Sequence, residues 1–523
     1  MKQQVLYTGG EIITLDAPAR AVLTEGERIL AVGNEAALRR MAGPDVREFP
    51  LKGQVMMPAF LDSHGHITAF AATLSLAPLG GAGSFAEIVS LLSKSAREHP
   101  QREWVIGFGY DHNVLKEGVH PDKKLLDAAF PDRPVLISHA SGHMGAANSE
   151  ALHRMGITRD TPDPDGGKIG RGEDGGPNGY LEETAFTLYS QAAPAARPEK
   201  IADDFKRAQQ HYLSCGISTA QEGFTRAGEM AVLADLAGKN LLTLDVVAYC
   251  DAGEGDEPLL PRSCGEKGKN RLRIGGYKVF LDGSPQARTA WLTRPYEGEE
   301  SYRGYPVHTD AELEETVHRV CAQRAQLLAH CNGDAAADQL ISAFERENRR
   351  CAVAPLRPVM IHAQTLRADQ LDRMKPLGMI PSFFAAHLWY WGDVHRKNLG
   401  KRAFCISPLH DAAAREMHFT LHQDTPVLPP NMLETIWCAV NRISREGVSM
   451  GEAQRITPEQ ALRAVTLDAA YQYFEEREKG SITPGKRADF VLLDGNPLTV
   501  APGDIRRLSV TGTILRGEMV SQA

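Results

Sequence analysis

Residues 56–66 read MMPAFLDSHGH, an apolar run that ends in two histidines separated by one glycine. Side chains two positions apart on a β-strand point to the same face of the sheet, so His64 and His66 can reach the same metal ion. The chain has 18 histidines, and one such pair alone is explained equally well by a structural role. The significance of the pair therefore depends on the rest of the chain.

The same arrangement recurs along the sequence. Seven further apolar segments carry polar residues at their carboxyl ends, with helical stretches between them: GISTAQEG, LLTLDVVAY, LRIGGYKVFLDGS, AQLLAHCNGD, PVMIHAQ, MIPSFF and FTLHQDTP. Alternating strands and helices predict a parallel sheet in an α/β protein. Together with residues 56–66 the segments number eight, as in a (β/α)8 or TIM barrel, where polar residues at strand carboxyl ends tend to be catalytic.

The barrel would occupy residues 56–477, with one large interruption. From His66 to Gly216 there are 150 residues, far more than one barrel helix can use. We therefore expect an inserted subdomain at about residues 70–200, after the first barrel strand. A loop that follows a barrel strand lies on the catalytic face, so the insertion is expected there.

The two ends of the chain are rich in short β-segments with glycine turns. Residues 1–55 contain segments such as QVLYTGG and RAVLTEGERILAVG, and residues 478–523 contain ADFVLLD and LSVTGTILRGEMV. Each end is too short to form a core of its own. The sequence predicts that they pair into one small β-sandwich domain.

Composition excludes several classes of function. Lysine and arginine number 58 against 66 aspartate and glutamate, a net charge of −8, so nucleic acids and anionic membranes are not expected as main partners. The start lacks the apolar core of a secretory signal, no run of about 18 apolar residues could span a bilayer, and the eight cysteines form no CxxC pair. We expect a cytoplasmic protein with a small-molecule substrate; a homodimer is one option for its oligomeric state.

Four more residues at strand ends carry chemistry. Lys278 lies in the apolar strand YKVFLDGS, where an unpaired ammonium is costly to bury. A salt bridge, for example to Asp282, would solve this, and so would carboxylation of the amine by CO2. His330, His362 and Asp424 each end an apolar run. Each alone is better explained as a structural or solvated residue, but five such strand ends in barrel order argue against coincidence.

Taken together, the segments resemble the amidohydrolase superfamily, and within it the long amidohydrolase family 3 branch that includes N-substituted formamide deformylase-like hydrolases. The matching segments extend over nearly the whole chain: PAFLDSHGH, PVLISHASGHMGAANSEAL, PNGYLEETA, GYKVFLDGS, HCNGDAAAD, IHAQ and GSITPGKRADFVLLDGNP. As a set they are specific for fold and metal site, and much less so for substrate.

The resemblance implies two divalent metal ions, most often zinc, although manganese or iron could occupy the same site. It implies six ligands: His64, His66, Lys278, His330, His362 and Asp424. The first two histidines would hold the more buried ion and the last two the other, with Lys278 bridging them as N6-carboxylysine. Hydroxide activated by the metals would attack a carbonyl and cleave an amide, N-acyl or N-formyl C–N bond, with Asp424 as the general base.

Six further residues are predicted to line the substrate site: His143, Glu183, His387, Trp389, Trp391 and His422. His143 is also a candidate catalytic group, although organising its loop is an equally good explanation. Capping a helix explains Glu183, and ordinary packing explains the aromatic run. The family commonly has Gly-Ser before the strand-8 aspartate where this chain has His422-Gln423, which predicts an unusual pocket. Asp334 is predicted to be a helix N-cap.

Other functions stay open at this stage. A deaminase or a lactone or ester hydrolase could use the same barrel, because a fold does not determine chemistry. Deaminases of this superfamily typically use one metal and no bridging lysine, so the Lys278 segment favours an amide hydrolase. A non-catalytic metal-binding regulator is the alternative from another class, but such proteins would be expected to lose ligands first.

Overall fold

The computed structural model describes residues 3–194, 198–253 and 270–522. The chain divides into two compact units. The first unit comprises Met1–His66, Gln209–Asp424 and Pro430–Ala523, and the second, the inserted unit, comprises Ile67–Ala208 and Thr425–Pro429. Each unit is described by itself.

An eight-stranded sheet forms the centre of the first unit, and its strands follow one another in the order of the chain. They are β7 (Phe60–Leu61), β14 (Ile217–Thr225), β15 (Asp245–Asp251), β16 (Leu272–Phe280), β17 (Gln326–Cys331), β18 (Val359–His362), β19 (Ile380–Phe383) and β20 (Thr420–Leu421). Every neighbouring pair is parallel. All eight predicted strands are thus present, in a TIM-barrel-like α/β fold.

The two edge strands of this sheet meet just beyond their carboxyl ends. The hydroxyl of Ser63 donates to the carbonyl oxygen of Leu421 at 3.0 Å, and the backbone N–H of Asp424 donates to the carbonyl oxygen of His64 at 3.2 Å. The carboxyl ends of the first and last strands are therefore held together. This contact places the residues that follow β7 and β20 beside each other.

Helices connect the strands, and local sequence explains their limits. They include α8 (Ala227–Gly238), α9 (Asp310–Ala322), α10 (Asp334–Glu347), α11 (Ala368–Met374), α13 (Gly392–Leu399), α15 (Met432–Asn441), α16 (Pro458–Ala464) and α17 (Leu467–Gln472). Helix α9 begins with a capping box between Thr309 and Glu312. The predicted cap of α10 is wrong, because Gly333 is its N-cap. Asp334 instead accepts from the backbone N–H of Thr293 and pairs with Arg367 at 3.0 Å.

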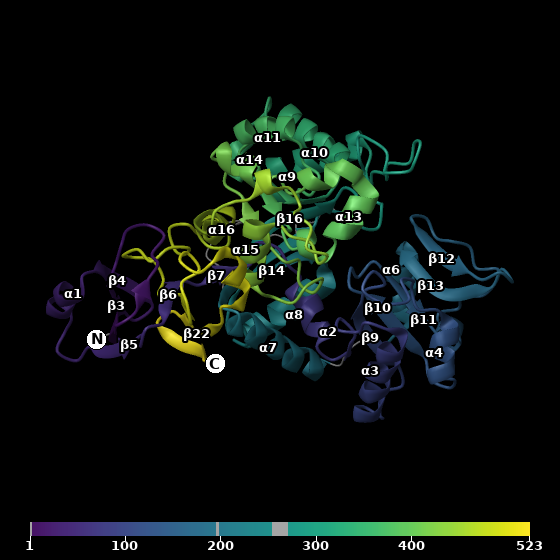
Figure 1. The fold of residues 1–523 in the computed structure, drawn as a ribbon, viewed down its shortest axis with the longest axis horizontal. Coiled ribbons are helices and arrows are strands. Elements are labelled where there is room, and N and C mark those ends of the chain that lie inside the picture. Colours follow the sequence, from purple (N-terminus) through teal and green to yellow (C-terminus); the bar gives the residue numbers. More distant parts are fainter. Residues whose placement is uncertain (1–2, 195–197, 254–269, 523) are drawn as a thin grey trace. The chain divides into compact units, whose positions relative to one another are not determined.

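Strands from both ends of the chain form two small sheets in the first unit, where the purple and yellow ribbons of Figure 1 lie side by side. One sheet has the order β4-β3-β1-β5 and the other the order β2-β6-β21-β22-β23. Their bounds are β1 (Gln4–Thr8), β2 (Glu11–Ile12), β3 (Ala21–Glu25), β4 (Arg28–Gly33), β5 (Arg47–Pro50), β6 (Val55–Pro58), β21 (Phe490–Leu493), β22 (Val510–Leu515) and β23 (Glu518–Gln522). Residues of both sheets share one hydrophobic cluster, which includes Tyr7, Val22, Met56 and Phe490.

The inserted unit has a six-stranded sheet of its own, in the order β12-β13-β11-β10-β9-β8. The strands are β8 (Ala77–Pro78), β9 (Val105–Tyr110), β10 (Val135–His139), β11 (Met144–Ala147), β12 (Gly167–Arg171) and β13 (Pro177–Glu183). Strands β8, β9 and β10 are parallel, and the other pairs are antiparallel. Helices α3 (Phe85–Glu98), α4 (Lys123–Ala129), α5 (Ser149–Arg154) and α6 (Thr184–Tyr189) accompany the sheet. Two hydrophobic clusters, around Leu92 and around Leu152, lie within this unit.

Two findings concern membrane-spanning helices and the state of the cysteines. Among the described residues, no helix is both long enough and apolar enough to cross a membrane. The seven cysteines within the described ranges are free thiols, and Cys264 lies outside these ranges.

Candidate metal centre

All six predicted ligands belong to the first unit and lie at or near the carboxyl ends of strands of its eight-stranded sheet. His64 and His66 follow β7, Lys278 lies near the end of β16, His330 lies in β17, His362 ends β18, and Asp424 follows β20. The carboxyl ends of parallel strands meet at one edge of a sheet. The predicted pattern therefore converges on this edge.

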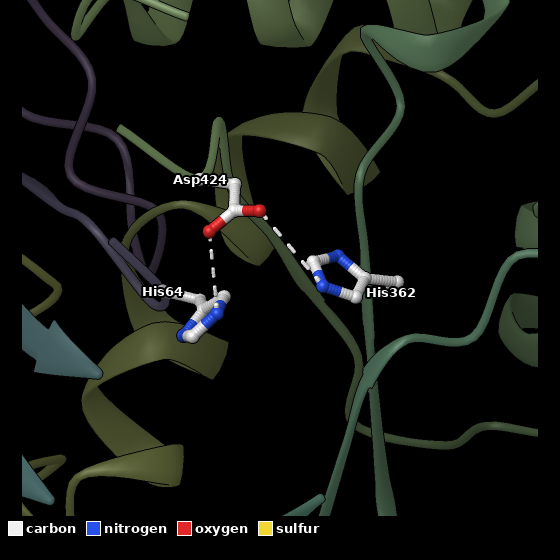
Figure 2. Close-up of side chains that lie close together, drawn as sticks. All are labelled: His64, His362 and Asp424. Atoms are coloured by element: carbon white, nitrogen blue, oxygen red, sulfur yellow. Dashed lines mark ion pairs between the residues drawn. The ribbon is translucent and has the colours of Figure 1, made fainter. Parts of the chain in front are cut away.

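Asp424 lies at the centre of the group, between histidines from two different strands (Figure 2). Its Oδ1 is 3.4 Å from Nε2 of His64 and 3.5 Å from Nε2 of His66. Its Oδ2 is 3.9 Å from Nε2 of His362. The carboxylate thus connects the strand-1 pair to the strand-6 histidine.

The remaining two ligands join the same group. Nε2 of His362 lies 3.1 Å from Nδ1 of His330, and Nζ of Lys278 lies 3.2 Å from Nε2 of His64. Nε2 of His330 contacts the carbonyl oxygen of Gly283 and the side-chain amide nitrogen of Asn332, each at 3.1 Å. These contacts on the far nitrogen hold the ring with Nδ1 directed at His362.

The spacing of these atoms fits a metal ion better than direct hydrogen bonds. Separations of 3.4 and 3.5 Å from Asp424 to His64 and His66 are long for charge-assisted hydrogen bonds. A tetrahedral ion with bonds of about 2.0–2.1 Å holds its ligand atoms about 3.3 Å apart. Imidazole and carboxylate donors are also the types that zinc, manganese and iron accept.

Lys278 is fully buried, and among the described residues no ion pair joins it to a carboxylate. Burial lowers the pKa of Lys278 to about 7, although the charge of Asp424 acts in the opposite direction. The alternative salt bridge to Asp282 is not formed. Asp282 instead accepts the backbone N–H groups of Asn332, Gly333 and Trp291 at 2.7–2.9 Å.

The histidines and Asp424 shift one another's ionisation. Burial alone would lower the pKa of His66, but the nearby carboxylates of Asp424 and Glu222 raise it to about 9. Burial would raise the pKa of Asp424, yet the neighbouring His66, His64 and His362 hold it well below its usual range. Asp424 is therefore a carboxylate at neutral pH, directed at the histidines.

Gln221 fixes the ring of His64, and the sequence reading did not identify it. Its Oε1 lies 2.6 Å from Nδ1 of His64, while its Nε2 donates to the carbonyl oxygen of Ser63 and to the hydroxyl of Tyr473. These two donor contacts set the orientation of the amide, so Nδ1 of His64 must be the donor and Nε2 keeps its lone pair. Glu222, the next residue in β14, lies 3.6 Å from Nδ1 of His66.

His422 is buried behind His362. Its Nε2 lies 3.1 Å from Nδ1 of His362, and its Nδ1 lies 2.9 Å from the hydroxyl of Ser382. Burial lowers the pKa of His422 to about 3, so the ring is neutral. These contacts orient His362, and contact with a substrate stays a prediction. Gln423 is turned away and exchanges two hydrogen bonds with the backbone of Asn431.

The aromatic run after β19 divides into two parts. His387 is buried, lies 3.1 Å from the ring of His395 and packs on Trp391. Trp389 instead packs edge-on against Trp437, and Arg506 lies over both indole rings. Packing accounts for these contacts, and a role of the run in substrate binding stays a prediction.

In the inserted unit, His143 and Glu183 form a pair. Nδ1 of His143 lies 2.8 Å from Oε2 of Glu183, and the His143 side chain is 44% exposed. Glu183 occupies the N-cap position of α6, but its side chain makes no capping hydrogen bond. Its carboxylate is directed to Nδ1 of His143 instead.

The chain is similar to known proteins over most of its length. The model of the Amidohydrolase family matches residues 47–521. The chain is 29% identical to N-substituted formamide deformylase of Arthrobacter pascens, over 98% of each chain, and 27% identical to the protein LONG AFTER FAR-RED 3 of Arabidopsis thaliana, over 99% of this chain and 91% of that one. The crystal structure of an uncharacterized metal-dependent hydrolase from Pyrococcus furiosus superposes with a TM-score of 0.76 at 26% identity, covering 95% of this chain and 100% of that chain.

Proposed function

Because the chain belongs to the amidohydrolase family, we propose that it hydrolyses the C–N bond of a small amide or N-acyl amine, N-formyl amines included. The observation that carries the proposal is the convergence of imidazole, carboxylate and lysine side chains at the carboxyl edge of one parallel sheet. The 29% identical relative that is named as a formamide deformylase favours this substrate class.

Two divalent ions, zinc in the first place, would be held by the six side chains described above. Among the described residues, His64, His362 and Asp424 each offer a ligand atom within 4.8 Å of the other two, while His66 lies 3.5 Å from Asp424 and His330 lies 3.1 Å from His362. When bound, such ions polarise a carbonyl group and lower the pKa of water. Proton transfer and positioning of the substrate would be carried out by side chains of the protein.

Lys278 would bridge the two ions after carboxylation. A neutral amine reacts with CO2, forming an N–C bond and releasing one proton, and the product is an anionic carbamate. A pKa of about 7 leaves a large neutral fraction of Lys278 at physiological pH. The carbamate would replace a cation by an anion with two oxygen donors, which suits a site that holds divalent ions.

Asp424 would act on the proton of the attacking water. Its carboxylate is ionised at neutral pH and lies within 4 Å of three histidine rings. It can accept the proton that water loses and deliver it to the nitrogen of the departing amine. His143 would contact the substrate carbonyl or the leaving group through Nε2, with Glu183 orienting its ring.

Turnover on a defined panel tests the reaction class. Protein purified without chelator would be assayed for two equivalents of metal and then offered N-formyl amines, N-acyl amines, lactones and aminopurines. We expect hydrolysis of N-formyl or N-acyl amines that is lost on chelation and restored by Zn²⁺. Deamination of aminopurines without amide hydrolysis, or turnover by protein free of metal, would contradict the proposal.

The role of His143 is tested separately. We expect His143→Ala to lower kcat/KM by roughly a hundredfold without loss of metal, as for removal of one positioned polar group. His153, an exposed histidine of the same unit, supplies the matched control when changed to alanine. Unchanged kinetics on several good substrates would show that His143 only organises its loop.

A further inference from the structure

A second group of metal-binding side chains lies in the inserted unit, apart from the six residues of the first. Strands β9 and β10 are parallel neighbours, and Tyr110 pairs in register with His139 at their carboxyl ends. Asp111 and His112 directly follow β9, and His139 is the last residue of β10. The two strand ends thus bring a carboxylate and two imidazoles together.

The three donor atoms form a small triangle. Nδ1 of His112 lies 3.3 Å from Nε2 of His139, which lies 3.4 Å from Oδ1 of Asp111, and the third side measures 3.9 Å. A triangle with these sides has a circumscribed radius of about 2.1 Å, and zinc bonds to nitrogen and carboxylate oxygen measure about 2.0–2.2 Å. One ion can therefore reach all three atoms at bonding distance without movement of the side chains.

Each donor is held by a neighbour. Oδ1 of Asp111 accepts from the backbone N–H and the side-chain amide of Asn113, both at 2.9 Å. Nδ1 of His139 lies 3.0 Å from the hydroxyl of Ser141 and 3.1 Å from the backbone nitrogen of the same residue, and these two contacts fix the orientation of the ring.

A third histidine supports the group from one side. The ring of His120 stacks on that of His112, with centroids 3.9 Å apart, and its Nδ1 lies 3.0 Å from the hydroxyl of Tyr110. The stack restricts rotation of the His112 ring. His139 is buried while the side chain of His112 is 28% exposed, so the triangle is anchored on one side and accessible on the other.

We propose that Asp111, His112 and His139 bind one divalent transition-metal ion, of which zinc is the best match. Two imidazole nitrogens and one carboxylate oxygen suit a transition-metal ion, whereas Ca²⁺ and Mg²⁺ prefer sites made of oxygen ligands alone. Three protein ligands leave a fourth position for water or a small anionic ligand. The site uses none of the six residues of the first unit, so it is independent of the proposed function.

Metal titration of stripped protein without a histidine tag tests the proposal. Zinc content would be measured after dialysis against about 1 µM free Zn²⁺, for the wild-type chain and for His112→Ala, Asp111→Asn and the control His153→Ala. We expect the first two variants to hold one equivalent less than the wild type and the control to hold the same amount. His112 and Asp111 are partly exposed, and circular dichroism would confirm that each variant keeps its secondary structure.

Two further arms separate this site from the first unit. In a background of His64→Ala and His66→Ala, the equivalent assigned to the inserted unit should persist, whatever happens to hydrolysis. With Co²⁺ in place of Zn²⁺, the absorption bands of a low-symmetry cobalt site should disappear in His112→Ala. If folded His112→Ala and Asp111→Asn retain the full metal content of the wild type, the triangle is only a hydrogen-bonded cluster and the proposal is overturned.

Discussion

Two lysines of the first unit are buried, and their surroundings are opposite. Lys479 lies 2.6 Å from Asp245 and 2.9 Å from Glu475 and donates to Thr219 at 2.9 Å. Asp245 begins β15, so Lys479 lies at the amino end of the eight-stranded sheet. Lys278 lies near the carboxyl end of β16 in that sheet, with the imidazole of His64 at 3.2 Å. Burial would lower the pKa of both amines; the carboxylates raise that of Lys479, whereas that of Lys278 falls to about 7.

This difference indicates a structural role for Lys479 and a reactive one for Lys278. At the amino end of β15, Asp245 is also paired with Arg487 and Arg516, so every charge there has a partner. At the carboxyl edge the carboxylate of Asp424 is shared among several histidines, and Glu222 and Asp282 each lie within 4 Å of one histidine. At the amino end of the sheet, each of these charged side chains is paired with an opposite charge within the protein. The carboxyl edge instead carries the side chains that are proposed to bind metal ions and, at Lys278, CO2.

The largest expected effect is at Lys278. Lys278→Ala should lower kcat by roughly a thousandfold or more and remove at least one equivalent of metal, because it removes the proposed bridging ligand. The melting temperature of the metal-free protein should change little. Formate or acetate should restore part of the activity by occupying the vacated position, whereas full activity with full metal content in the variant would remove the contrast between the two lysines.

Substitution of Lys479 should reduce stability and leave the metal content unchanged. Lys479→Met leaves Asp245 and Glu475 with one cation fewer in a buried setting, which should lower the free energy of unfolding by about 3–5 kcal/mol. Denaturant titration measures this loss, and the folded variant should keep its metal content. The exposed pair of Lys239 and Asp235 offers the control, since Lys239→Met removes a surface pair only.

The acid limb of stability tests the amino end of the sheet. Burial opposes ionisation of Asp245, but Lys479, Arg487 and Arg516 hold its pKa below the usual range. A carboxyl group with a depressed pKa stabilises the fold above its unfolded value of about 4, and this contribution is lost as the pH falls below that value. Between pH 5 and pH 3 we expect the wild type to lose about 1 kcal/mol more than Asp245→Asn. Parallel stability curves for the two proteins would show that Asp245 is not the responsible group.

The smallest effect is expected at Gln221. Gln221→Leu removes the acceptor that fixes the tautomer of His64, and loss of such a supporting contact typically weakens metal binding by about 10–100-fold. Competition with a chelator measures this change. Gln209, which binds the backbone around Thr243 and Leu244 in the same unit, provides a control, because Gln209→Leu should reduce stability and not metal affinity.

Features that depend on a few consecutive residues could be predicted from the sequence. An apolar run followed by His64, His330 or Asp424 marks both a strand and the end of that strand, so the eight strands and the six convergent residues could be read directly. Lys278 could be singled out because a charged residue inside an apolar strand is anomalous. These signals all lie within a few consecutive residues.

The undetected features depend on partners far away in the chain. Gln221 lies within the strand GISTAQEG and looks like an ordinary polar residue until His64 is placed beside it. The triangle of Asp111, His112 and His139 arises from the register of β9 against β10, which no single segment specifies. The segment PVLISHASGHMGAANSEAL, which contains His139, is recognisable in the sequence, but its pairing with β9 is not.

Pairing between the ends of the chain also has a consequence during biosynthesis. Met57 of β6 pairs with Val491 of β21, which in turn pairs with Thr513 of β22. While the ribosome is still reading the codons between them, Met56 and its apolar neighbours on the nascent chain have no native cover. A polypeptide released early would keep that apolar surface exposed to chaperones and proteases, so the small sheet favours the removal of unfinished copies.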